Sequence, residues 1–265
     1  MYLNFYGLKE DPFSVTSNPG FFLECSPHKE ALSALLYGIK ERKGIILVTG
    51  EVGTGKTTLC KILLERLDSQ VKTSLVLNPY FSPTQLLQAI VEDFGIIVKK
   101  RNKLDIAKEL TSFLLKCHAS GANAVVVIDE AQNLSARQLE QIRLLTNLET
   151  SNAKLLQIIL VGQPELMDKI NDPALRQIKQ RIFVKCSLVP LTLAEVKQYI
   201  RFRLTKAGKA SITITPESYK IIYEFSGGIP RLINMLCDRA MLLGYLEENN
   251  NFDERIFKIC SEELA

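Results

Sequence analysis

Residues 50–57, GEVGTGKT, decide the fold of this 265-residue chain, because they fit the phosphate-binding pattern G-x-x-x-x-G-K-[ST] at every fixed position. The preceding stretch, 44–49 (GIILVT), is short, apolar and rich in β-branched residues, which predicts a buried strand. The following residues, 57–67, carry apolar side chains at helical spacing, at positions 59, 62, 63 and 67. The segment therefore has the strand, loop and helix that this motif requires.

The residue types in this loop suit a triphosphate. Gly53 and Gly55 let consecutive backbone N–H groups point inward, and the helix that opens near Lys56 adds its positive end. Lys56 is expected to reach the β- and γ-phosphates, and the hydroxyl of Thr57 to ligate Mg²⁺. The predicted cofactors are thus ATP and Mg²⁺. The predicted nucleotide-binding residues of the loop are Gly50, Glu51, Val52, Gly53, Thr54, Gly55, Lys56, Thr57 and Thr58.

Composition narrows the class of protein. Apolar residues make up 46% of the chain, enough for a proper core, and the net charge of +4 permits an acidic partner without requiring one. The six cysteines are scattered singly and there are two histidines, which argues against a zinc site or a disulfide framework. No signal peptide and no uncharged apolar run of membrane-spanning length is visible. We expect a cytoplasmic protein, brought to the inner membrane if partners or a further segment supply an anchor.

Charge is unevenly distributed. Residues 190–246 contain eight basic and four acidic residues, whereas residues 247–265 contain two basic and six acidic residues. The densest basic run is residues 99–103 (KKRNK). Either basic region could contact a nucleic acid or another polyanion, and either could be a solvated surface.

The first 27 residues are rich in aromatic residues and turn formers, which predicts an irregular arm. The arm could cover an adenine ring, or its aromatic side chains could pack into a core. A helix with Pro27 in its first turn follows and runs to Ile39. The expected organisation is an arm (1–27), an α/β domain with a parallel sheet (28–190) and a small all-helical domain with an acidic tail (191–265).

Residues 124–130, AVVVIDE, form the second functional segment. Four β-branched residues predict a buried strand, and two carboxylates follow it. Ligands of open α/β sheets bind at the carboxyl ends of the strands, so Asp129 is placed to hold Mg²⁺. Glu130 is placed to polarise a water molecule for attack on the γ-phosphate.

Three further polar positions are candidates. Gln163 follows the strand expected over 154–161, where it could orient the attacking water if that strand neighbours 124–128, or could cap the next helix. Arg176 and Arg181 flank a last short strand, 182–185, and either could reach a neighbouring subunit's nucleotide or form a surface ion pair. Arg231, after the turn GGIP, could reach the phosphates from the second domain or be solvated.

The remaining elements follow from periodicity and capping signals. The strand after the phosphate loop is expected at 73–78, with helices at 83–94, 104–118 and 135–149. Thr192 and Glu195 form a capping-box pattern at the start of the second domain. Its four expected helices are 192–207, 216–226, 229–246 and 252–262.

Taken together, these motifs resemble those of AAA+ ATPases over residues 28–246. In several short stretches the sequence is also similar to the general secretion pathway protein A family, the ExeA-like ATPases. The similar stretches are YxxFYGLxxxPF at the start, SPHKEAL at 26–32, GEVGTGKTT at 50–58, DEAQ at 129–132, GQPEL at 162–166 and GIPR at 228–231.

The resemblance implies Mg²⁺-dependent ATP hydrolysis by a homo-oligomer. It identifies Lys56 and Thr57 with the Walker A motif, and Asp129 and Glu130 with Walker B. Gln163 takes the sensor-1 place, where AAA+ proteins commonly have Asn or Thr, and Arg231 takes the sensor-2 place. Arg181 matches the arginine finger, with Arg176 as the other candidate.

Three classes of function are compatible with these residues. The resemblance to the general secretion pathway protein A family favours an ATPase that drives assembly or transport in a secretion or pilus machine of the envelope. The second class is a DNA-binding regulator of the transposition type, whose affinity for duplex DNA would fall steeply with salt. The third is a nucleotide-gated scaffold with little turnover.

Overall fold

The computed structural model describes residues 2–98, 102–208 and 211–264, which form two compact units. One unit, here termed the sheet unit, comprises Pro27–Gly50 and Leu59–Leu188. The other, termed the lid unit, comprises Met1–Ser26, Glu51–Thr58 and Val189–Ala265. The phosphate loop is therefore grouped with the arm and the C-terminal helices, although it directly follows the first strand of the sheet along the chain.

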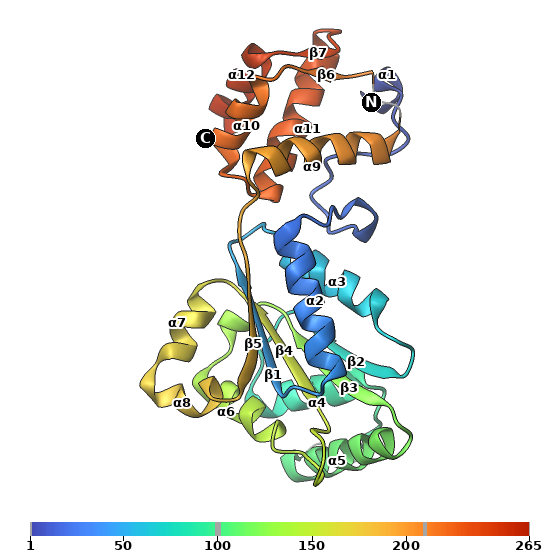
Figure 1. The fold of residues 1–265 in the computed structure, drawn as a ribbon, viewed down its shortest axis with the longest axis vertical. Coiled ribbons are helices and arrows are strands. Elements are labelled where there is room, and N and C mark those ends of the chain that lie inside the picture. The colour runs from blue at the N-terminus through green and yellow to red at the C-terminus, as the bar shows by residue number, and fades with distance from the viewer. Residues whose placement is uncertain (1, 99–101, 209–210, 265) are drawn as a thin grey trace. The chain divides into compact units, whose positions relative to one another are not determined.

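The sheet unit is built on a five-stranded parallel sheet with the order β2-β3-β4-β1-β5 (Figure 1). The strands are β1 (Ile45–Gly50), β2 (Val71–Val76), β3 (Asn123–Ile128), β4 (Gln157–Gly162) and β5 (Ile182–Leu188). The three inner strands, β3, β4 and β1, are buried nearly throughout, as expected of short apolar runs covered on both faces. The edge strand β5 instead alternates between partly buried and exposed residues.

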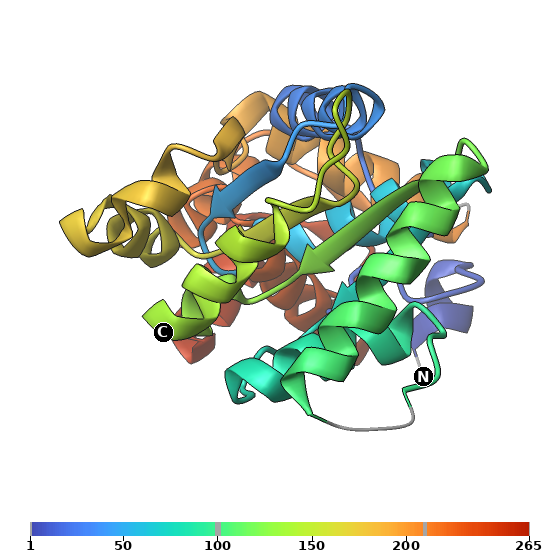
Figure 2. The same ribbon diagram turned by 90° about the horizontal axis from the view of Figure 1, so that it is seen from below.

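Helices cover both faces of this sheet (Figure 2). On one face lies α2 (Ser26–Lys40), and a Cβ added at Gly38 would come within 2.5 Å of Ile46, so glycine allows this close approach. The opposite face presents Ile45 and Leu47 to a continuous apolar core, in which each fully buried Ile or Leu contributes about 1.5–3 kcal/mol. The helices on that face are α4 (Pro83–Asp93), α5 (Lys103–Ala119), α6 (Ala136–Leu145), α7 (Glu165–Asn171) and α8 (Arg176–Lys179).

One helix of the sheet unit is shorter than expected. The helix that Ser135 caps was expected to reach Glu149, but α6 ends at Leu145. The chain then turns so that Glu149 forms a backbone bridge and an ion pair with Lys154, and β4 begins only at Gln157. Tertiary pairing of these two residues outweighs the local helical pattern.

The lid unit contains the four expected helices, α9 (Leu193–Ala207), α10 (Ser218–Ser226), α11 (Pro230–Leu246) and α12 (Glu254–Leu264). The capping box predicted at Thr192 and Glu195 is confirmed. Two short strands were not expected: β6 (Thr213–Ile214) and β7 (Asn251–Phe252) pair in parallel. They are too short for an alternating pattern to be recognised.

The arm is more regular than its composition predicts. It contains a short helix, α1 (Tyr2–Tyr6), and a 3-10 turn, η1 (Pro19–Phe21). Tyr6, Phe13 and Phe21 are buried in the apolar core of the lid unit, and the Tyr6 hydroxyl donates to the Met241 carbonyl at 2.9 Å. Core packing is thus the observed role of these aromatic side chains.

Gly228→Ala is expected to destabilise the lid unit strongly. Gly228 has φ +79°, and a Cβ there would lie 2.0 Å from the backbone oxygen of Leu191, whose own N–H donates to the Gly228 carbonyl. Backbone strain costs about 1–2 kcal/mol, and the displaced backbone brings the expected loss to roughly 3 kcal/mol or more.

The adjacent glycine provides the control. Gly227 also has positive φ (+56°), but an added Cβ would meet no atom within 4 Å. Gly227→Ala should therefore cost only the strain, about 1 kcal/mol. Urea unfolding followed by far-UV circular dichroism compares the two, and equal losses would show that the contact with Leu191 is unimportant.

Candidate nucleotide site

The phosphate loop is closed around one of its own carbonyl groups. Lys56 donates from Nζ to the Glu51 carbonyl oxygen at 2.9 Å, and the Thr54 hydroxyl donates to the same oxygen at 2.8 Å. Lys56 and Thr54 are buried, and Gly53 and Gly55 have φ of +84° and +95°. Helix α3 (Lys56–Arg66) begins at the lysine itself. A cationic head group, helical N–H groups and two left-handed glycines fit a phosphate ligand.

Gly53 also permits the lid helix α11 to approach the loop. The Arg231 N–H donates to the Gly53 carbonyl at 3.2 Å, and a Cβ at Gly53 would lie 2.6 Å from the Arg231 Cβ and 3.0 Å from the Ile229 Cγ2. The backbone of Arg231 is thereby brought to the phosphate loop within the lid unit, while its side chain is exposed. The sequence pattern had given only the phosphate-binding reason for this glycine.

In the sheet unit, the acidic pair follows β3 directly. Asp129 is 2% exposed, its N–H donates to the Val76 carbonyl at 2.8 Å, and its Oδ1 accepts from the Glu130 N–H at 2.9 Å. Glu130 is left-handed, with φ +52°, which is unusual for a residue other than glycine. Backbone strain of this kind is concentrated at functional sites, because the surrounding structure must hold it in place.

Two amide side chains hold the Glu130 carboxylate. Its Oε2 accepts from Gln132 Nε2 at 2.5 Å and from Gln163 Nε2 at 3.4 Å. Gln132 Oε1 in turn accepts from the Gln163 N–H at 3.1 Å. Gln163 reaches this position because β3 and β4 are neighbours, with Ile128 beside Leu160. Glu130, Gln132 and Gln163 therefore form one hydrogen-bonded group, here termed the carboxylate–amide cluster.

Sequence reasoning from single residues missed Gln132. The only signal was the segment DEAQ at 129–132, in which Gln132 belongs to the motif but had no assigned role. Its backbone is also fixed, because Lys169 Nζ donates to the carbonyls of Gln132, at 2.5 Å, and Leu134, at 2.9 Å. A Cβ at Gly162 would lie 2.8 Å from Gln132 Oε1, so the glycine that ends β4 leaves room for the amide.

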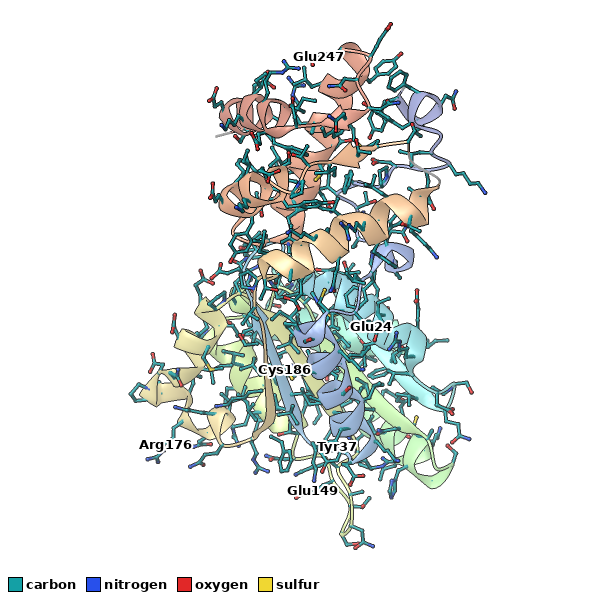
Figure 3. All side chains as sticks on the ribbon, turned by 45° about the horizontal axis from the view of Figure 1, so that its top comes forward. Glu24, Tyr37, Glu149, Arg176, Cys186 and Glu247 are labelled. Carbon is teal, nitrogen blue, oxygen red and sulfur yellow. The ribbon has the colours of Figure 1, made fainter. Side chains whose placement is uncertain are left out.

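The two candidate finger arginines lie away from the acidic pair. Arg176, labelled in Figure 3, begins α8 and is exposed. Arg181 directly precedes β5 and is also exposed. The strands are parallel with Ile182 beside Ile45, so Arg181 lies at the amino ends of the strands and Asp129 at the carboxyl ends. An arginine in this place cannot serve the acidic pair of its own chain.

Arg181 lines a basic depression of about 790 Å³ at that edge of the sheet. The other cations around it are Lys40, Arg42, Lys43 and Lys154. Lys43 also lies over the Phe183 ring, 4.3 Å from its centroid. The separate basic run at 99–103 lies largely outside the described residues; Lys103 begins α5 and is exposed.

In the described part of the chain, every helix is too short or too polar to cross a membrane.

The fold and these motifs define a P-loop protein of the AAA+ class. A family model described as an AAA domain matches residues 39–170. The chain is 44% identical over 266 residues to general secretion pathway protein A of Aeromonas hydrophila, and the similarity extends over 100% of this chain. It covers 49% of that protein, so it spans about half the length of this relative. The chain is thus an AAA+ protein similar to general secretion pathway protein A, and the predicted resemblance and fold class are confirmed.

Solved structures share the fold at low identity. Cdc6p from Pyrobaculum aerophilum has a TM-score of 0.71 and 18% identity, with 92% of this chain and 68% of that chain covered. The ORC2 protein of Aeropyrum pernix has a TM-score of 0.68 and 17% identity, covering 92% of this chain and 71% of that chain. The RuvB Holliday junction branch migration motor of Thermotoga maritima has 0.60 and 19%, covering 89% and 68%. These likenesses concern the fold alone.

Proposed function

We propose that this chain binds ATP with Mg²⁺ at the phosphate loop and hydrolyses it. The observation that carries the proposal is the loop itself, in which Lys56 heads an eleven-residue helix behind two left-handed glycines. Lys56 would neutralise the β- and γ-phosphates, and Thr57 and Asp129 would hold the metal ion. The chemistry that Mg²⁺ would supply there is electrostatic stabilisation of the negative charge that develops on the phosphates.

Glu130 would act on the attacking water. A carboxylate within hydrogen-bond reach of water can orient it and accept its proton during in-line attack on the γ-phosphate. The two amides of the carboxylate–amide cluster hold this carboxylate, so Gln163 and Gln132 would position Glu130 rather than contact phosphate themselves. Arg231 would couple the lid to the nucleotide, since its backbone already contacts Gly53.

Full turnover would require a second copy of the chain. Arg181 lies at the amino ends of the strands, whereas Asp129 lies at their carboxyl ends. This placement fits an arginine that completes the site of a neighbouring subunit. We propose that Arg181 is this finger, that Arg176 is not essential, and that the protein acts as a homo-oligomer.

The relative suggests where this activity is used. General secretion pathway protein A is similar over this whole chain. We therefore propose that ATP hydrolysis drives assembly or transport in an envelope machine, at the cytoplasmic side of the inner membrane. No described residue identifies the partner. For this function we propose that the chain is organised as an arm (1–27), an ATPase domain (28–190) and a lid (191–265).

Turnover measured against protein concentration tests this function. Specific activity should rise with concentration, disappear on chelation of Mg²⁺ and be unaffected by duplex DNA. Arg181→Ala should lower turnover by at least about a hundredfold, because an arginine finger contributes roughly 10³–10⁵. Arg176→Ala is the matched control. Mixing the Arg181→Ala protein with the Glu130→Gln protein should restore part of the activity. At some contacts between subunits, one copy then supplies an intact Glu130 and its neighbour an intact Arg181.

Other outcomes would redirect the proposal. Full activity of a strict monomer would exclude a finger in trans. Stimulation by duplex DNA that fades with salt would replace the envelope role with DNA-dependent regulation. Oligomerisation with ATP but without turnover would indicate a nucleotide-gated scaffold.

A further inference from the structure

Arg203 is a buried cation in the lid unit. It lies on α9, is 5% exposed and is two residues from Arg201, which is exposed. Within the described part of the chain Arg203 forms no ion pair with a carboxylate. Burying a charge is costly unless hydrogen bonds and favourable contacts compensate for the lost water. Its actual partners therefore indicate what this side chain is for.

Those partners are in the arm. Arg203 donates from Nε to the Pro12 carbonyl and from Nη2 to the Ser14 carbonyl at 3.2 Å. Its guanidinium carbon lies 5.0 Å from the centroid of the Phe21 ring, a cation–π contact with a third arm residue. If the arm left the lid, all three contacts would be lost.

The third nitrogen of the guanidinium is linked to α11 through Tyr199, which lies on α9 itself. Arg203 Nη1 donates to the Tyr199 hydroxyl at 2.6 Å, and that hydroxyl donates to Asn234 Oδ1 at 3.0 Å. Burial raises the pKa of Tyr199 above its usual range, so the hydroxyl keeps its proton. Because arginine can only donate, the single tyrosine proton is directed to Asn234. Tyr199 and Asn234 are both buried.

Asn234 is one helical turn after Arg231, whose N–H donates to the phosphate loop at Gly53. The arm, α9 and α11 are thus joined by hydrogen bonds through Arg203 and Tyr199, and the first turn of α11 is in turn bonded to the phosphate loop at Gly53, all within the lid unit. We propose that Arg203 is a positioning residue: it straps the arm to the lid and, through Tyr199 and Asn234, sets the first turn of α11 against the phosphate loop. The consequence for ATP rests on the proposed function; the strap itself does not.

Hydrogen exchange on the full chain, together with titration of a fluorescent ATP analogue, tests this. Arg203→Met keeps the apolar stem and removes the donors. We expect amide exchange about tenfold faster in residues 2–22 and in residues 230–236, and affinity for the analogue weakened about tenfold. Arg203→Lys should restore part of each, since an ammonium can reach a carbonyl but lacks the planar fork. Arg201→Met, on the same helix, should match the parent.

Tyr199→Phe separates a relay from general loss of structure. It leaves the arm's carbonyl bonds to Arg203 in place and removes the hydroxyl that joins Arg203 to Asn234. Exchange in residues 2–22 should stay at the parent rate, while exchange in 230–236 rises and affinity for the analogue falls several-fold, since the buried hydrogen bond to Asn234 is lost.

The outcomes distinguish this inference from the proposed function. Unchanged exchange in residues 2–22 of Arg203→Met would overturn the strap. Unchanged exchange in 230–236 and unchanged affinity in Tyr199→Phe would overturn the relay. If the parent chain does not bind the analogue, the proposed function fails, and the two exchange measurements still decide whether Arg203 positions the arm and α11.

Discussion

Lys56→Ala is expected to abolish measurable ATP binding while leaving the fold intact. The ammonium group of Lys56 is buried in the phosphate loop, where Nζ donates to the Glu51 carbonyl. A charge-assisted contact with phosphate in such a site is about twice as strong as a neutral hydrogen bond. Losing it, together with the bond that closes the loop, should weaken affinity by at least about a hundredfold, which corresponds to roughly 3 kcal/mol.

Titration of a fluorescent ATP analogue measures this loss, with circular dichroism as the check on folding. Lys61→Ala is the matched control, since it removes the same charge from the same helix, α3, farther from the loop. Lys61→Ala should bind as the parent does. Equal affinity of Lys56→Ala and the parent would contradict the assignment of the nucleotide site to this loop.

The elements that could be predicted are those whose sequence signal is local. A buried strand reads as a short apolar run, so the apolar residues before Gly50 and before Asp129 predicted β1 and β3 within about a residue. A side chain that depends on the order of the strands is different. Gln163 could be placed beside Glu130 only on the condition that β3 and β4 are neighbours, which the strand order then satisfied.

The features that were missed depend on contacts distant in sequence. Arg203 and Arg201 look alike in the pattern RFR, yet one is buried under the arm and the other is exposed. Helical spacing with the buried Tyr199 and Ile200 places position 203 on the inner face of α9. The carbonyl groups that accept from a buried arginine there belong to Pro12 and Ser14, about 190 positions earlier, so no window of α9 contains them. Similarly, α6 ends early because Glu149 pairs with Lys154, and the arm is ordered because Tyr6 finds a core that the last helices provide.

Glu130→Gln is expected to separate binding from chemistry. Glutamine has the same shape as glutamate, and its remaining oxygen can still accept from Gln132 or Gln163, so the carboxylate–amide cluster should keep its geometry. ATP affinity should stay within about threefold of the parent. Turnover should fall by at least about a hundredfold, because an amide cannot accept a proton from the attacking water and a general base contributes roughly 10²–10⁴.

Glu165→Gln is the matched control for the loss of charge, since Glu165 is an exposed glutamate at the start of α7 in the same sheet unit. It should hydrolyse ATP at the parent rate. Single-turnover measurement of phosphate release compares the variants, and turnover of Glu130→Gln within threefold of the parent would remove Glu130 from the chemistry.

The same variant also tests the subunit arrangement, because it should hold ATP without consuming it. If Arg181 completes a neighbour's site, ATP held in Glu130→Gln should stabilise the contact between copies, and sedimentation with ATP should show a larger species than sedimentation without it. Arg181→Ala in the same background should weaken that assembly, since the buried guanidinium–phosphate contact is lost. A Glu130→Gln protein that binds ATP and remains monomeric at every concentration would retain the catalytic role of Glu130 and exclude Arg181 as a finger.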